Sequence, residues 1–333
     1  MLKILQDNEI SRENWNNLLV DSLFTSPFQT PEYFNLIRKI KGFDPSVFAL
    51  YDSGKIKVLM VVTTLKESGF SGFFSRRGIV FGGPVISCAT KEELSFFLKE
   101  AGNRLKGKAI YLETRNLFDY SFYKDSFLKS GWSYEPYLNV KLNLIGVTKE
   151  NLFSLFKYNR RREIKQSIIN GAVYHLCSKR EEVFSVYQIL RNIYRENVKL
   201  PLPSFDFFFE FFKNNILKVF VVIHEERIIG GSFCLILPEK GLYTFYYCGQ
   251  RDYHKRIFPT HLAVFAALEY AVENKIPVVD FMGAGRPDVE YGVRKYKLEF
   301  GGELVEQGRF LKVLNPILYI LGKFSLGVIK AIR

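Results

Sequence analysis

The sequence predicts an α/β fold made from one unit that occurs twice. At 333 residues, 47% of them hydrophobic, the chain is longer than a single core usually supports. Each half also shows one order of patterns: two strands around a polar turn, a third strand, a helix and a last strand. We therefore expect two related domains, residues 1–148 and 149–333.

In the first half, apolar runs predict strands over 43–67, interrupted by a turn at Asp52-Ser53-Gly54-Lys55, and over 78–86. Residues 91–108 have helical spacing, with Leu94, Phe97 and Leu98 followed by Ala101 and Leu105. A further strand is expected over 108–115. This gives the first copy of the unit.

The second half repeats this order of patterns with a different amino-acid sequence. Strands are expected over 217–237, around a turn at Glu225 and Glu226, and over 241–250. Residues 260–276 form an apolar helical pattern, and 277–285 read as the strand after it. This gives the second copy.

A helical insertion is expected between the copies, over about residues 151–215. It begins with a basic helix from near Leu155 to a terminal glycine, Gly171. An amphipathic helix over 181–197 and a Phe-rich helix capped by Ser204 follow.

The bulk properties favour a cytoplasmic protein with an anionic partner. The formal net charge of +13 suits nucleic acid, an anionic membrane surface or a phosphorylated substrate, although a basic protein without such a partner is also possible. The four cysteines have no metal-ligand spacing, so no metal is expected. The N-terminus lacks a secretory pattern, and no uncharged apolar run is long enough to span a membrane.

Four segments together resemble the Fem family. Arg161, Ile164 and Gly171 match its R-x-x-I-x-x-A-x-x-x-G-V segment, with Ser167 in place of the usual alanine. Residues 291–310 resemble its G-[LIV]-x-x-F-K-x-x-F-G segment, with Tyr296-Lys297 in place of Phe-Lys. The runs 25–34 and 258–271 are similar to further landmarks of the family, in the same order.

The resemblance implies a tandem fold of the acyl-CoA N-acyltransferase type (GNAT-like), with mixed sheets flanked by helices. It also implies cytosolic enzymes that transfer amino acids from aminoacyl-tRNA to peptidoglycan precursors. Related acetyltransferase-like proteins are linked to envelope polysaccharide. No cofactor beyond the acyl donor is implied.

The residues before the apolar helix of the second half bear on the identity of the acyl donor. Acetyl-CoA enzymes of this fold bind pyrophosphate at a glycine-rich loop before a helix, where backbone N–H groups come close. The matching residues here run from Arg256 to His261, without glycine and with Pro259, which has no N–H. This favours aminoacyl-tRNA over acyl-CoA, although a proline at a helix start fits either donor.

A basic cluster predicts phosphate binding at the acceptor or the donor. Tyr158, Arg161, Arg162 and Lys165 share one face of the expected helix, and Arg160 lies on an adjoining face. Guanidinium groups bind phosphate through paired donors, so these residues and Arg256 are candidate ligands of a nucleotide-linked or lipid-linked precursor, or of tRNA. A solvated helix face is the alternative.

Lys297, Asp280 and Asp288 are the candidate catalytic residues. An ammonium at Lys297, beside Tyr296, would stabilise the oxyanion that forms when an amine attacks an ester. Asp280, at the end of a buried strand, or Asp288 could take the proton of the amine. Asp280 could instead cap loop N–H groups. The four histidines, including His261, show no ligand or triad spacing.

The C-terminal segment 316–333 reads as an amphipathic helix beginning at Asn315-Pro316. Its cations share a narrow face opposite Leu, Ile, Val and Phe, which suits the inner face of a membrane as well as packing on its own domain. The sequence therefore favours a cytoplasmic, membrane-peripheral aminoacyl or acyl transferase acting on an envelope precursor. The alternatives are an acyl-CoA-dependent N-acyltransferase for polysaccharide or lipid, and a non-catalytic module that binds RNA or membrane.

Overall fold

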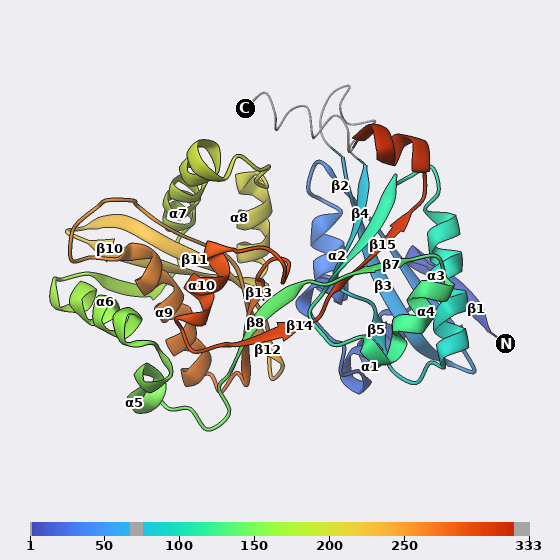
Figure 1. Ribbon diagram of the computed structural model, residues 1–333, viewed down its shortest axis with the longest axis horizontal. Coiled ribbons are helices and arrows are strands. Elements are labelled where there is room, and N and C mark those ends of the chain that lie inside the picture. The colour runs from blue at the N-terminus through green and yellow to red at the C-terminus, as the bar shows by residue number, and fades with distance from the viewer. Residues whose placement is uncertain (1, 67–75, 323–333) are drawn as a thin grey trace. The chain divides into compact units, whose positions relative to one another are not determined.

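The computed structural model describes residues 2–66 and 76–322, which form two α/β units, each with a mixed sheet flanked by helices (Figure 1). Unit 1 contains residues Met1–Tyr137 and Glu306–Arg333, and unit 2 contains Leu138–Val305. The expected order of strand, turn, strand, strand, helix and strand is present in both.

In unit 1 the elements of this order are β2 (Phe43–Asp52), β3 (Lys55–Leu65), β4 (Arg77–Gly82), α3 (Lys91–Arg104) and β6 (Tyr111–Asn116). The remaining elements are β1 (Lys3–Gln6), α1 (Arg12–Asp21), α2 (Pro31–Ile37), β5 (Val85–Ile86), α4 (Lys124–Lys129), β7 (Ser133–Glu135) and β15 (Arg309–Val313). Helix α3 forms where the sequence predicts it, because Thr90 and Glu93 cap each other's backbone N–H groups.

In unit 2 the corresponding elements are β10 (Leu217–His224), β11 (Arg227–Leu237), β12 (Gly241–Gly249), α9 (Pro259–Glu273) and β13 (Val278–Gly283). The others are β8 (Leu138–Asn143), α5 (Lys149–Leu152), α6 (Tyr158–Ile169), β9 (Val173–Leu176), α7 (Arg180–Ile193), α8 (Phe205–Lys213), α10 (Gly292–Leu298) and β14 (Glu303–Glu306). The basic helix α6 begins at Tyr158 rather than Leu155, because residues Phe153–Leu155 form a separate 3-10 turn.

The two sheets have the same strand order. Unit 1 reads β1-β2-β3-β4-β6-β15-β7 and unit 2, taken in the same sense, reads β9-β10-β11-β12-β13-β8-β14. In both sheets the sixth strand is not part of the repeated order of elements. In unit 1 it is β15, which follows unit 2 in the chain, and in unit 2 it is β8, which precedes α5 and α6. Helix α6 has no counterpart among the described residues of unit 1.

The sheets to which β8 and β15 belong place the domain limits away from residues 148 and 149. Strand β8, expected in the first domain, pairs with β13 of the second sheet. Strand β15, expected in the second, pairs with β6 and β7 of the first. Both strands are short, so their own sequences do not show which sheet accepts them.

The cores follow from the same patterns. In unit 1 one cluster lies on each face of the sheet, with Leu94, Phe97 and Leu98 of α3 buried in the first and Trp15 of α1 buried in the second. In unit 2 helix α9 is buried along most of its length, from Leu262 to Ala271, in the larger cluster.

The C-terminal segment begins as expected. Residues 316–322 are helical, and the side chain of Asn315 accepts a hydrogen bond from the backbone N–H of Leu318 at 3.0 Å. The remainder of the proposed membrane helix, 323–333, lies outside the described residues. Among the helices of residues 2–66 and 76–322, none has the length and apolar character to cross a membrane.

Candidate functional site

The candidate site lies in unit 2, where two parallel strands separate. Strands β12 and β13 pair only at Leu242–Val279 and Tyr243–Asp280. Beyond these positions β12 continues to Gly249 without pairing with β13. The corresponding parallel strands of unit 1, β4 and β6, pair over six consecutive positions from Arg77–Tyr111 to Gly82–Asn116. Unit 2 therefore has an opening between its central strands, which we call the strand opening, and unit 1 does not.

Lys297 lies where β13 departs from β12. Its Nζ donates to the carbonyl oxygen of Gly283 at 2.7 Å and contacts that of Met282 at 3.4 Å. Met282 has a left-handed φ of 61°, so the strand is bulged at this point and its carbonyls need a donor. Burial lowers the pKa of Lys297 to about 8, against the opposing effect of Asp280. The third N–H of this ammonium has no acceptor among these contacts.

Asp280 is buried beside the same bulge. Its Oδ1 accepts the backbone N–H of Met282 at 2.6 Å, and its Oδ2 lies 3.7 Å from Nζ of Lys141. Burial raises the pKa of Asp280, and the nearby lysines Lys141 and Lys297 oppose that rise. Asp280 thus caps a loop N–H group, the alternative role that the sequence left open, and the cations Lys141 and Lys297 are nearby.

Asp288 stands apart from this arrangement. It is exposed, and both of its carboxylate oxygens accept from Arg286, at 3.1 and 3.0 Å. Hydrogen bonds from Arg286 lower the pKa of Asp288. A carboxylate with a lowered pKa, held by a guanidinium, is a poor acceptor for the proton of an amine.

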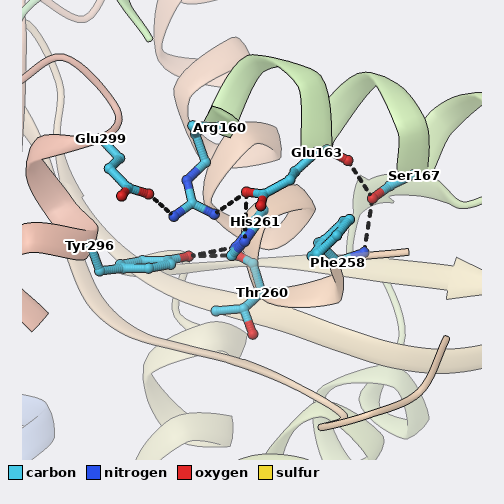
Figure 2. Close-up of polar contacts among 8 residues, drawn as sticks. All are labelled: Arg160, Glu163, Ser167, Phe258, Thr260, His261, Tyr296 and Glu299. Atoms are coloured by element: carbon cyan, nitrogen blue, oxygen red, sulfur yellow. Dashed lines mark hydrogen bonds and ion pairs between the residues drawn. The ribbon is translucent and has the colours of Figure 1, made fainter. Parts of the chain in front are cut away.

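A second polar cluster joins α6 to α9 and α10 (Figure 2). Arg160 is buried, and its guanidinium binds Glu163, at 3.3 Å, and Glu299. The same guanidinium lies over the rings of Tyr296 and Phe300, at 4.7 and 5.0 Å from their centroids. Arg160 is therefore occupied within the protein, and the expectation that it binds a substrate phosphate is corrected.

His261, in the first turn of α9, connects this cluster to Tyr296. Its Nε2 lies 3.3 Å from Oε2 of Glu163, and its Nδ1 lies 3.4 Å from the hydroxyl of Tyr296. Burial, and after it the charge of Arg160, lower the pKa of His261 to about 3. The imidazole is therefore neutral at pH 7, and its contact with Glu163 is a hydrogen bond from Nε2–H rather than an ion pair. Nδ1 is then an acceptor, and it competes for the one proton of the Tyr296 hydroxyl with the carbonyl oxygen of Thr260, which lies 3.3 Å from that hydroxyl.

Helix α6 also covers the start of α9. The Ser167 hydroxyl accepts the backbone N–H of Phe258, the residue before the helix, at 2.8 Å. Gly249 lies so close that an added Cβ would be 2.5 Å from the backbone nitrogen of Thr260. With Pro259 lacking an N–H and Ser167 bound to Phe258, this helix start offers few donors to a pyrophosphate.

The other cations expected at a phosphate site lie on the outside of α6 or nearby. Tyr158, Arg162 and Lys165 are exposed, and Arg256 is exposed in the loop before α9. Arg161 is half-buried and donates to the carbonyl oxygen of Phe156 at 3.3 Å. The structure thus separates Arg160 from its neighbours and brings Tyr296 into the cluster with it.

The ring of Tyr296 extends the cluster towards the strand opening. It stacks on Tyr247, which lies in the part of β12 that does not pair with β13, with 5.6 Å between ring centroids and 22° between ring planes. Burial raises the pKa of both phenols, so both remain protonated at neutral pH. The opening is therefore bordered by two uncharged tyrosines on one side and approached by Lys297 at the β13 bulge.

Sequence reasoning missed His261, Glu163 and Glu299. Their partners are far away in the chain: 98 residues separate Glu163 from His261, and 139 separate Arg160 from Glu299. One local signal was available, because Arg160 shares the stripe of Ile164 and Ser167, which are apolar or small and face inward. An arginine on that stripe must find carboxylates inside the protein.

The low pKa of His261 makes stability depend on pH. An unfolded chain protonates this imidazole below about pH 6.5, whereas the folded chain does so only near pH 3. The free energy of unfolding should therefore fall as the pH drops from about 6.5, by up to about 1.4 kcal/mol per pH unit from this group. Glu163, with its raised pKa, acts in the opposite direction. In urea unfolding at pH 7, 6 and 5, His261→Gln should show a shallower decline than the wild type; parallel declines would contradict this account.

Comparison with known proteins agrees with this description. Residues 222–325 match the FemAB family. Over 95% of this chain the fold is similar to that of FemX, at 14% identity and a TM-score of 0.74, with 99% of FemX covered. A tandem GNAT protein from the clavulanic acid biosynthesis pathway matches at 10% identity and a TM-score of 0.62, covering 95% and 99% of the two chains.

A third solved structure, L-PGS from Bacillus licheniformis, matches at 12% identity and a TM-score of 0.56, with 94% of this chain and 96% of that one covered. No curated protein sequence matches significantly. The structural likenesses establish the tandem fold, and the family match covers the strand opening, α9 and α10. The expected resemblance to the Fem family is thereby confirmed over residues 222–325, and the chain has a tandem GNAT-like fold.

Proposed function

We propose that unit 2 transfers an aminoacyl group from aminoacyl-tRNA to an amine of a phosphorylated cell-envelope precursor. The separation of β12 and β13 beyond Tyr243–Asp280 carries this proposal, because the two strands no longer pair with each other beside Lys297, and we place an extended acyl donor between them. The FemAB match over the same region supports an envelope acceptor. The named relatives FemX and L-PGS have the same fold.

The chemistry follows from the environment of Lys297. The amine of the acceptor attacks the ester carbonyl carbon, a C–N bond forms, and the carbonyl oxygen becomes an oxyanion. The ammonium of Lys297, held on the Gly283 carbonyl, has an N–H left for that oxyanion. The C–O bond to the donor then breaks, and the departing ribose oxygen takes a proton that the amine has lost. Asp280 stays a candidate for carrying that proton, since its raised pKa suits a proton acceptor.

The covering of α9 supports a donor without CoA. In enzymes that use acetyl-CoA, the corresponding helix start receives the pyrophosphate through free N–H groups. Here Ser167 takes one N–H, Pro259 lacks one, and the Glu163 carboxylate lies against His261 in the first turn. A pyrophosphate bound at this helix start would be repelled by the Glu163 carboxylate, so pyrophosphate binding is disfavoured.

The proposal is tested by ligand protection and by transfer. Acetyl-CoA and a longer acyl-CoA should leave the melting temperature unchanged at fixed salt, while a nucleotide-linked muropeptide should raise it by mass action. Labelled aminoacyl-tRNA with the muropeptide should then give a product whose label resists mild alkali, as an amide does and an ester does not. Protection and acyl transfer by acyl-CoA alone would replace this proposal with an acyl-CoA-dependent N-acyltransferase.

A further inference from the structure

We propose that the hydroxyl of Thr244 binds the α-amino group of the donor's aminoacyl group in the strand opening of unit 2. Thr244 is the first residue of β12 beyond the last pair with β13, Tyr243–Asp280. The inference rests on the proposed function and narrows it, because it selects an aminoacyl donor over a plain hydrocarbon acyl donor. It involves residues of unit 2 alone.

The hydroxyl of Thr244 is buried without a hydrogen-bond partner. Only 3% of the residue is exposed, and its Oγ1 has no partner among the described residues. The other buried serine and threonine hydroxyls of unit 2 are bonded: Ser167 accepts the backbone N–H of Phe258, and Ser232 donates to the carbonyl oxygen of Ala263, both at 2.8 Å. An unpaired hydroxyl away from water destabilises a fold, and valine would fill the same space without that cost. The exception therefore indicates a ligand rather than a role in packing.

The neighbours of Thr244 leave one side for a partner. Leu242 belongs to the core that contains α9, so Thr244, two residues later, lies on the same face of the sheet. Its β11 partner is Cys234, whose thiol donates to the Ser232 hydroxyl at 3.9 Å. Leu242 has no polar side-chain atom to offer. On its other side β12 no longer pairs with β13, so a partner for the hydroxyl can come from the side on which the strands separate.

The polar groups at this separation match the parts of an aminoacyl ester. Lys297 has an N–H for the carbonyl oxygen, and the α-amino group is attached to the next carbon of the donor. That amino group needs an acceptor, and the lone pairs of Thr244 Oγ1 provide one. Asp280, the β13 partner of the preceding residue, adds a carboxylate at the last paired position.

Such an arrangement discriminates between donors. A site built to hydrogen-bond a polar group rejects an analogue that lacks the group, because the buried partner is then left unpaired. A donor that carries a hydrocarbon acyl group would leave Thr244 without a bond. Thr244 is therefore a specificity residue, whereas Lys297 acts on the ester of any acyl donor.

The test is Thr244→Val, which removes the hydroxyl and keeps the shape of the side chain. Its melting temperature should equal or exceed that of the wild type, because no internal hydrogen bond is lost. Thr114→Val is the matched control for stability: the Thr114 hydroxyl is buried and accepts the backbone N–H of Phe310 at 2.9 Å, so its loss should lower the melting temperature by about 3 °C.

Transfer is measured with the nucleotide-linked muropeptide and total tRNA charged with a labelled mixture of amino acids. The kcat/KM for charged tRNA should fall about tenfold or more in Thr244→Val, and Thr244→Ser should recover most of it. The amino acid that the wild type transfers best is then compared, on tRNA, with its analogue lacking the amino group. The preference of the wild type for the amino form should shrink about tenfold in Thr244→Val.

The outcomes separate this inference from the proposed function. Wild-type transfer by Thr244→Val, or an unchanged preference for the amino form, would overturn the role of Thr244 and keep the function. A melting temperature lowered as much as in Thr114→Val would assign the hydroxyl a partner within the protein and overturn it as well. A wild type that transfers from no charged tRNA would reject the proposed function, and the inference with it.

Discussion

Replacing Lys297 by methionine should reduce the rate of aminoacyl transfer by about 10²–10³-fold, the usual effect of removing one donor to an oxyanion. Methionine keeps the buried stem and removes the ammonium, and the carbonyls of Met282 and Gly283 lose their donor, so a melting curve must show that the variant is folded before its rate is compared. Lys295→Met is the matched control, because Lys295 is exposed on the same helix. A Lys297→Met enzyme that transfers at the rate of the control would show that this ammonium does not act in the reaction.

The pH profile distinguishes an oxyanion donor from a base. With a pKa of about 8, Lys297 is charged below that pH and neutral above it. An ammonium that stabilises the oxyanion predicts a rate that declines as the pH rises through about 8, and a general base predicts a rise. In Lys297→Arg, residual activity should not show the decline, because arginine stays protonated.

Replacing Arg160 by methionine should lower the free energy of unfolding by about 3 kcal/mol, in the range found when one member of a buried ion pair is removed. Glu163 and Glu299 would then face each other inside the protein without a cation. Arg162→Met is the control on the same helix: Arg162 is exposed, and its loss should cost no more than about 0.5 kcal/mol. Urea unfolding at pH 7 measures both.

Lower pH should reduce the deficit of Arg160→Met. Protonation of Glu163, whose pKa is already raised by burial, removes half of the uncompensated charge. The difference between this variant and wild type should therefore shrink between about pH 7 and 5. A constant deficit would assign the loss to packing over Tyr296 and Phe300 instead.

The sequence predicted the repeated unit because its signals are local. Apolar alternation and helical spacing are read within one segment, and each expected strand and helix of the repeat is present. The domain limits could not be read in this way. The partner of β15 is β6, almost 200 residues earlier, and only packing selects it.

The candidate site was predicted unevenly for a similar reason. Lys297, Tyr296 and Asp280 belong to patterned segments, and the structure places Lys297 and Asp280 at one bulge. Among consecutive arginines, however, the phase of the helix decides which one turns inward, and that one is Arg160. His261 has no spacing motif because its partners come from two other helices.

The return of β15 to the first sheet ties the two halves of the chain together during synthesis. When the ribosome has made residues 1–137, the place between β6 and β7 is still empty, and it stays so until residues 309–313 emerge. The nascent first unit must wait with unpaired strand edges, which are prone to wrong pairing. A gene cut after residue 137 should consequently yield an insoluble fragment, and coexpression of a peptide spanning β15 should improve its yield.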